Sequence, residues 1–284
     1  MTIVMKFAIC NEIFYNEDPA RWSISSQFTA AAELGFQALE IAPFTLAPHV
    51  AEISEAQKQE IVSCSEKTGV AVAGLHWLLV GPQDMHLTSP DASVRESTVG
   101  YLEELVRFGT DIGGSVMVVG SPQQRDIREG VKYEDAWAWF REAMARCGQA
   151  GLEADFKVCI EPLAGATKNN FLFRGHEVLR MVKEIDMPNV GIILDTYSGV
   201  KEETDLPAAI RDAGNRLFHY HCNDDSGYAP GIGDTDFVPL MEALTDIGFD
   251  RYASIEVFKS DRPAMEQAEI GLKTLKSALA QARS

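Results

Sequence analysis

The chain has 284 residues, of which 46% are hydrophobic, so it is long enough for one large core or two small ones. Its formal net charge is −17, from 25 Lys and Arg against 42 Asp and Glu, and such a surface repels phosphate backbones. These figures argue against general nucleic-acid binding and favour solubility.

The chain contains five cysteines, an odd number with no Cys-x-x-Cys pair. This count predicts reduced thiols rather than a disulfide framework or a zinc ribbon. The opening residues, MTIVMKFAICNEIF, lack the basic start and the small-residue cleavage site of a signal peptide. No stretch approaches the roughly 20 apolar residues of a membrane helix. We therefore expect a cytoplasmic protein that does not act at a membrane.

Short apolar runs alternate with longer amphipathic stretches along the chain. Eight of the runs are predicted as strands, and their lack of strict alternation fits strands buried on both faces, as in a parallel sheet. In chain order they begin at Lys6, Ala38, Ala71, Ser115, Lys157, Val190, Leu217 and Tyr252.

Eight amphipathic segments separate these runs and are predicted as helices. Glycine closes several of them, as at Gly35 and Gly69, which is typical of helix ends. Eight strands alternating with eight helices predict the α/β class, and the count favours a single (β/α)₈ TIM barrel over residues 1–284. No Gly-x-Gly-x-x-Gly follows the first strand, which argues against a dinucleotide-binding sheet. The helical segments are residues 23–35, 54–68, 89–114, 133–151, 175–188, 205–214, 236–249 and 263–282.

In such a barrel the active site lies at the carboxyl ends of the strands. A buried carboxylate there costs several kcal/mol unless it is compensated, and the last four strands offer few basic residues nearby. Three carboxylates and one imidazole on these strands predict a divalent cation, and the donor set fits Mn²⁺, Mg²⁺, Co²⁺ or Zn²⁺ without deciding among them. The four residues are Glu161 in CIEPL, Asp195 in IILDTY, His221 in HYHCND and Glu256 in SIEVF.

Structural roles are the alternative, because each carboxylate alone could cap the following helix or bind an arginine. We expect His219 on the opposite side of its strand from His221, as a hydrogen-bonded structural histidine. His76 in GLHWLL and Glu40 in ALEIAP also lie at strand ends and are candidates for substrate binding. Four aromatic residues are assigned either to a wall of the substrate site or to the core or an interface: Phe14, Trp22, Phe44 and Trp77.

The motifs CIEPL, IILDTY, His-x-His and SIEVF resemble those of the xylose isomerase-like barrel superfamily of sugar isomerases and epimerases. The resemblance covers nearly the whole chain, and the nearest well-known branches are the D-tagatose/D-psicose 3-epimerases and the hydroxypyruvate isomerases. It implies an isomerase or epimerase that acts on a small keto-sugar or sugar acid through an enediolate, as a homodimer or homotetramer. It also implies an acid–base pair and one divalent ion, for which Mn²⁺ is favoured over Mg²⁺, Co²⁺ or Zn²⁺. The ion would be held by Glu161, Asp195, His221 and Glu256, and the pair would be Glu161 and Glu256.

Three positions depart from the pattern of the epimerase branch. Ser198 stands where that branch has a substrate-polarising histidine, and Gly227 stands where it has an arginine. The glutamate that follows the strand-five motif is also missing, and Lys168 in the same segment would suit an acidic or phosphorylated substrate. Lys168, Ser198 and Asn223 are therefore predicted as substrate contacts in a changed site.

The changed substrate contacts leave a lyase as an alternative, namely a dehydratase, a decarboxylase or an enzyme that cleaves a 3-keto-glycoside. The endonuclease branch of the superfamily fits less well, because it uses three metals and a basic DNA-binding face, whereas this chain has six histidines and a charge of −17. A non-catalytic sugar-binding protein is the remaining alternative, and unchanged turnover in a Glu256→Gln variant would favour it.

Overall fold

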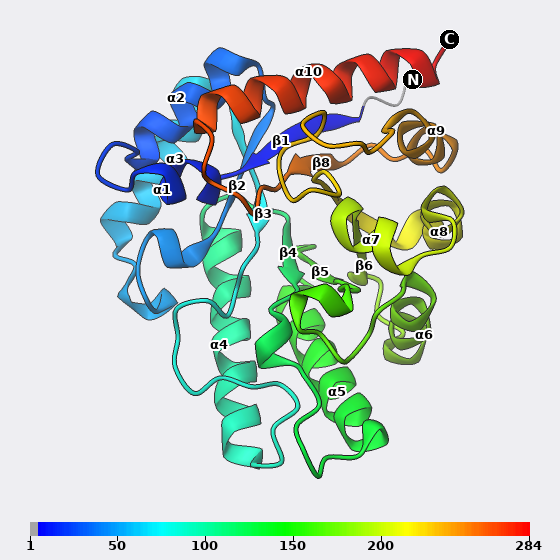
Figure 1. The fold of residues 1–284 in the computed structure, drawn as a ribbon. Coiled ribbons are helices and arrows are strands. Elements are labelled where there is room, and N and C mark those ends of the chain that lie inside the picture. Colours follow the sequence, from blue (N-terminus) through cyan, green and yellow to red (C-terminus); the bar gives the residue numbers. More distant parts are fainter. Residues whose placement is uncertain (1–4) are drawn as a thin grey trace.

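The computed structural model describes residues 5–284, and its eight parallel strands close into a barrel (Figure 1). Strands adjacent in the chain are adjacent in the barrel, and β1 pairs in parallel with β8 to complete it. The predicted TIM barrel is therefore confirmed. The strands are β1 (Lys6–Cys10), β2 (Ala38–Ile41), β3 (Ala71–Leu75), β4 (Val116–Val119), β5 (Lys157–Ile160), β6 (Val190–Asp195), β7 (Leu217–Cys222) and β8 (Tyr252–Ile255).

Helices surround the barrel, and α10 crosses one side of it beside α9 (Figure 1). Ser54 shows how such a helix begins, because its hydroxyl accepts a hydrogen bond from the Gln57 N–H while the Gln57 side chain returns to Ser54. The helices in predicted positions are α2 (Ile24–Leu34), α3 (Glu55–Thr68), α4 (Ala92–Asp111), α5 (Tyr133–Gly151), α6 (Gly175–Ile185), α8 (Leu206–Ala213), α9 (Val238–Asp246) and α10 (Ala264–Ala282).

Two further helices, α1 (Glu12–Glu17) and α7 (Thr196–Glu202), begin at the carboxyl ends of β1 and β6. The sequence pattern assigns their first residues to strands, because each segment continues an apolar run. Asp195 ends that run at β6, since its carboxylate accepts the Ser198 N–H at 2.7 Å and caps α7. The barrel strands are therefore shorter than predicted, and helices start directly at the level of the site.

Different regions of the barrel interior hold apolar, small and polar side chains. One region is apolar and includes Val118, Cys159 and Ile193. Elsewhere the small side chains of Ala8, Ala38 and Ala73 lie together. Two residues further along β1 and β2, on the same side of each strand, stand Cys10 and Glu40. The alanines lie nearer the amino-terminal ends of the strands than these polar groups. Bulkier side chains at the alanine positions would fill the barrel axis.

All five cysteines are free and buried, in agreement with the prediction of reduced thiols. Within residues 5–284, no helix combines the length and the apolar character needed to cross a membrane.

Close packing between strands yields a stability prediction at Gly191 in β6. A Cβ there would lie 2.5 Å from the Arg216 carbonyl oxygen and 2.6 Å from the Phe218 ring. Gly191→Ala should therefore lower the free energy of unfolding by about 1–3 kcal/mol, as overpacking does. The control is Gly100→Ala in α4, where a Cβ meets nothing within 4 Å, and where alanine should be neutral or stabilising. Urea unfolding of both variants measures the difference, and equal stability would contradict the packing argument.

Candidate active site at the carboxyl ends of the strands

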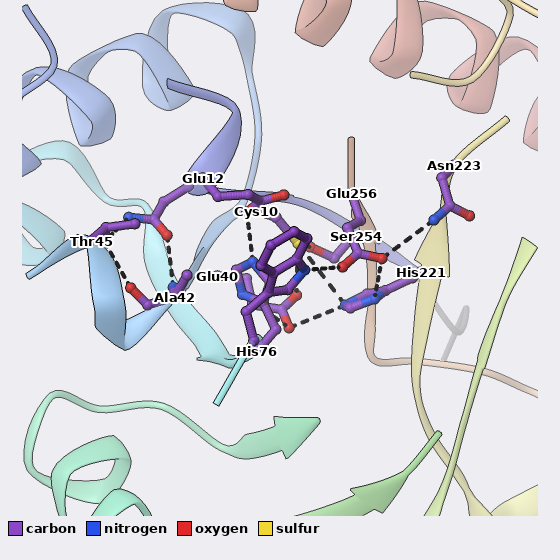
Figure 2. Close-up of polar contacts among 12 residues, drawn as sticks. Cys10, Glu12, Glu40, Ala42, Thr45, His76, His221, Asn223, Ser254 and Glu256 are labelled. Atoms are coloured by element: carbon purple, nitrogen blue, oxygen red, sulfur yellow. Dashed lines mark hydrogen bonds and ion pairs between the residues drawn. The ribbon is translucent and has the colours of Figure 1, made fainter. Parts of the chain in front are cut away.

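Three of the four predicted metal ligands meet at one end of the barrel. Glu161 follows β5, His221 lies in β7, and Glu256 follows β8. One ligand atom from each of them lies within 4.8 Å of the other two, and all three side chains are buried. Figure 2 shows His221 and Glu256 pointing toward one another, with 3.1 Å between Nδ1 and Oε2. The two oxygen donors and one nitrogen donor suit a hard or borderline divalent cation.

Asp195, the fourth predicted ligand, is connected to this group through Asn223. Its Oδ2 accepts a hydrogen bond from the Asn223 amide nitrogen at 2.8 Å, and the same nitrogen lies 3.3 Å from Glu256 Oε2. Its Oδ1 caps α7, so the alternative interpretation as a helix cap holds for this carboxylate. Each carboxylate oxygen has two lone pairs, and capping therefore does not occupy all of its acceptor capacity. The role of Asp195 as a ligand stays a prediction.

Negative charge is crowded around Glu161. Burial, together with the charges of Glu256 and Asp195, raises the pKa of Glu161 to about 8, while His221 and Arg125 oppose the shift. Burial and the charge of Glu256 also raise the pKa of Asp195. Burial would raise the pKa of Glu256 as well, but the charge and hydrogen bond of His221 outweigh it and lower that pKa. A cation at this point would relieve the repulsion, so the donor set fits one.

Glu40 holds the second nitrogen of His221. Its Oε1 lies 3.2 Å from His221 Nε2 (Figure 2). Its Oε2 lies 2.8 Å from His219 Nε2. A carboxylate behind a ligating imidazole fixes the orientation and tautomer of the ring. Glu40, a predicted substrate contact, is fully buried against the two histidines and is not among the cavity-lining residues, so its role in substrate binding stays a prediction.

The expectation that His219 faces away from His221 was wrong. Residues two apart on a strand share one side, and both rings contact Glu40 from inside the barrel. The structure does confirm that His219 is buried and hydrogen-bonded.

Glu12 and His76 form a second buried pair, which the sequence analysis did not identify. His76 Nε2 lies 2.6 Å from Glu12 Oε2, and neither residue is exposed. Within residues 5–284, the other two polar atoms, Glu12 Oε1 and His76 Nδ1, have no hydrogen-bond partner. Glu12 lies two residues beyond the end of β1, so the strand-end rule that selected the other acidic residues would have selected it as well.

A cavity of about 550 Å³ opens above Glu161 and Glu256. Trp77 forms part of its lining, and the indole N–H donates a hydrogen bond to Glu256 Oε1 at 2.7 Å. The Trp77 backbone has a φ of +52°, a strained value for a bulky residue and one that clusters at functional sites. The full lining is His76, Trp77, Val80, Val118, Gly120, Ser121, Pro122, Gln123, Gln124, Glu161, Leu163, Ala166, Thr167, Tyr197, Glu256 and Phe258.

The four aromatic candidates divide between this cavity and the core. Trp77 lines the cavity, and Phe44 packs against it with ring centroids 6.0 Å apart. Phe14 and Trp22 are buried against each other, with centroids 4.8 Å apart, and belong to the core.

The predicted substrate contacts also lie in different places. His76 lines the cavity, whereas Asn223 holds Asp195 and accepts the Tyr197 N–H through its own oxygen. Ser198 is buried and is not among the lining residues, and its backbone N–H donates a hydrogen bond to Asp195 Oδ1. Lys168 is exposed and is not among the lining residues. The turn Gly165–Thr167 places Ala166 and Thr167 at the cavity, and Lys168 follows the end of this turn.

A closed parallel barrel with two carboxylates and an imidazole converging at its carboxyl ends defines a TIM-barrel protein with a candidate metal-dependent active site. The chain belongs to the xylose isomerase-like TIM barrel family, whose model matches residues 28–278. This membership confirms the resemblance inferred from the sequence motifs.

Several curated relatives are named as epimerases. The chain is 28% identical over 254 residues to D-psicose 3-epimerase of Ruminiclostridium cellulolyticum, covering 87% of this chain and 83% of the relative. It is 25% identical over 266 residues to 3-dehydro-D-guloside 4-epimerase of Escherichia coli, covering 89% of this chain and 92% of the relative. The crystal structure of D-psicose 3-epimerase with D-tagatose from Clostridium cellulolyticum has a TM-score of 0.83 at 23% identity, covering 97% and 99% of the two chains. At that identity the structural likeness shows the shared fold.

Gly120 gives a direct test of the position of Glu161. A Cβ at residue 120 would lie 2.1 Å from Glu161 Oε2, so Gly120→Ala must displace the carboxylate. We expect Mn²⁺ affinity, measured by calorimetric titration, to fall at least about tenfold, as it does when ligand placement is disturbed. Gly100→Ala serves as the control for the substitution itself. Unchanged Mn²⁺ affinity in Gly120→Ala would show that Glu161 is not a ligand of the ion.

Glu40→Gln tests the support behind His221. The amide cannot accept hydrogen bonds from both histidines, so the ring should lose its fixed orientation, and Mn²⁺ affinity should fall about 10–100-fold. Glu12→Gln is the matched control, because Glu12 is also a buried carboxylate bonded to a histidine but does not contact His221. Similar losses in the two variants would indicate a general effect of neutralising buried charge rather than support of His221.

Proposed function

We propose that this chain, an enzyme of the sugar isomerase and epimerase class, is a divalent-metal-dependent epimerase of keto-sugars. It would move a proton on the carbon next to the carbonyl, through an enediolate. The observation that supports this most strongly is the pair Glu161 and Glu256, which reach one cavity floor from β5 and β8 beside His221. Two carboxylates at one cavity can serve as acid and base for a single carbon.

Glu161, His221 and Glu256, with Asp195 held nearby by Asn223, would hold the ion. When bound, the ion would supply Lewis-acid stabilisation of the negative charge that develops on the substrate oxygens. Neither lysine nor arginine is among the cavity-lining residues in the described part of the chain, and the buried Arg125, whose charge acts on Glu161, lies outside that lining.

Glu256 is prepared for proton transfer by its neighbours. The indole N–H of Trp77 donates to one of its oxygens, and the imidazole of His221 lies at the other. Both contacts favour the ionised carboxylate and hold it at the cavity floor, where it can accept a proton from the carbon next to the carbonyl. Glu161 reaches the floor from β5, and its carboxyl group would return a proton to the same carbon to complete the inversion.

The names of the relatives are consistent with this chemistry. D-psicose 3-epimerase and 3-dehydro-D-guloside 4-epimerase both invert a carbon adjacent to a carbonyl, at different positions of the sugar. We infer the same type of step for this chain, with a neutral carbohydrate as substrate.

Metal analysis combined with isotope exchange tests the proposal. After dialysis against Mn²⁺, the wild type should carry one ion per chain by elemental analysis, and a Glu161→Gln/Asp195→Asn variant should carry none. The loaded wild type should incorporate deuterium next to the carbonyl of D-psicose or of methyl 3-keto-glucoside in D₂O. Glu256→Gln should slow this exchange by about 10²–10⁴-fold, the usual contribution of a general base.

Three outcomes would decide against parts of the proposal. Absence of an ion in the wild type would make the converging residues structural. Unchanged exchange in Glu256→Gln would remove that residue as the base. Release of an eliminated product in place of an epimer would identify a lyase that uses the same proton abstraction.

A further inference from the structure

The cavity above the carboxylates has very little charge in its walls. Its only acidic lining residues are Glu161 and Glu256 at the floor, and its lining includes no lysine or arginine of the described chain. The uncharged polar side chains Ser121, Gln123, Gln124 and Thr167 come from the segments after β4 and β5. The segments after β3, β6 and β8 supply mainly apolar and aromatic side chains, namely Trp77, Val80, Tyr197 and Phe258.

The rim of the cavity exposes large apolar side chains to solvent. Val80 and Phe258 are each about 40% exposed, and they are two of the five large hydrophobic residues that the described chain exposes to this extent. Apolar surface gathered at a concave site is typical of ligand contact, whereas single apolar residues scattered over a surface are ordinary. The other three are Tyr133, Leu152 and Val200, and none of them lines this cavity.

The aromatic rings at the cavity are held in place by neighbours. Phe258 packs edge-on against Tyr197, with ring centroids 5.1 Å apart, and Trp77 is supported by Phe44. The Lys201 ammonium lies over the Tyr197 ring, 3.4 Å from its centroid, and bonds to the carbonyl oxygens of Tyr197 and Asp225. The apolar wall is therefore formed before any ligand binds, which lowers the cost of ordering it.

A free monosaccharide fits this wall poorly. It carries a hydroxyl on nearly every carbon, and a hydroxyl buried against Val80 or Phe258 would lose its hydrogen bonds to water without replacement. A phosphate or carboxylate would find no lysine or arginine among the lining residues of the described chain, and the one lining histidine, His76, is already paired with Glu12. A volume of about 550 Å³ lies within the range of sites that take ligands larger than a single sugar ring.

We propose that the natural substrate is a neutral keto-glycoside, in which the keto-sugar carries an apolar alkyl or aryl substituent. The sugar lies on the floor at Glu161 and Glu256, with its hydroxyls toward the polar side chains after β4 and β5. The substituent packs against Trp77, Val80 and Phe258. This inference rests on the proposed function for the reacting sugar, and it adds the chemical class of the group attached to it.

The test compares two probes that differ only in the substituent, phenyl and methyl 3-keto-β-D-glucoside. With Mn²⁺-loaded protein in D₂O, NMR follows deuterium uptake next to the carbonyl. We expect kcat/KM for the phenyl compound to exceed that for the methyl compound at least about tenfold, since burying a ring removes on the order of 100 Å² of apolar surface from water. Phe258→Ser should bring this ratio close to one. Leu152→Ser, at an equally exposed apolar residue outside the cavity, should leave the ratio as in the wild type.

The outcomes separate this inference from the proposed function. Equal kcat/KM for the two glycosides, or faster exchange of free D-psicose than of either, would overturn the keto-glycoside assignment while the epimerase proposal stands. If no compound exchanges, the epimerase proposal fails, and calorimetric titration with phenyl and methyl β-D-glucoside then tests the apolar wall alone. Tighter binding of the phenyl compound, lost in Phe258→Ser, would support the wall, and equal binding would overturn it.

Discussion

The site depends on one imidazole held between two buried carboxylates. Glu40 contacts His221 at Nε2 and Glu256 contacts it at Nδ1, so the ring cannot turn without losing both partners. Each of these groups would be costly to bury alone, and together they compensate one another. Because Glu40 lies in β2, His221 lies in β7 and Glu256 directly follows β8, the barrel has to close before the arrangement exists. Fold and site are thus specified by the same contacts.

The chain carries a formal charge of −17, and at its active-site end histidines and neutral donors contact the carboxylates, while the buried Arg125 acts on Glu161 through its charge. Trp77, Asn223 and His221 all donate to, or lie beside, carboxylate oxygens there. Neutral donors hold carboxylates in place without cancelling their charge. The cluster therefore keeps the negative character that a divalent ion requires, and it keeps acceptors available for the substrate.

Much of the fold and part of the site could be predicted from the sequence. Eight apolar runs between eight amphipathic segments suffice for the barrel, and the strand-end rule brings Glu161, His221 and Glu256 together as predicted. The linkage of Asp195 through Asn223 could not be predicted, because it depends on side-chain geometry at the ends of the paired strands β6 and β7. The positive φ of Trp77 is invisible in residue order, since local propensity disfavours it and tertiary contacts impose it. The prediction for His219 was wrong because residues two apart on a strand face the same side, so His219 and His221 both contact Glu40.

The buried pair of Glu12 and His76 has a consequence for how this sequence can change over time. Loss of either partner alone leaves a polar or charged group uncompensated in the barrel interior, whereas replacement of both by apolar residues of similar volume need not be costly. The two positions are 64 residues apart in the chain, yet they face the same constraint. Among descendants of this chain, residues 12 and 76 should therefore covary, and the pair should be inherited or lost as a unit.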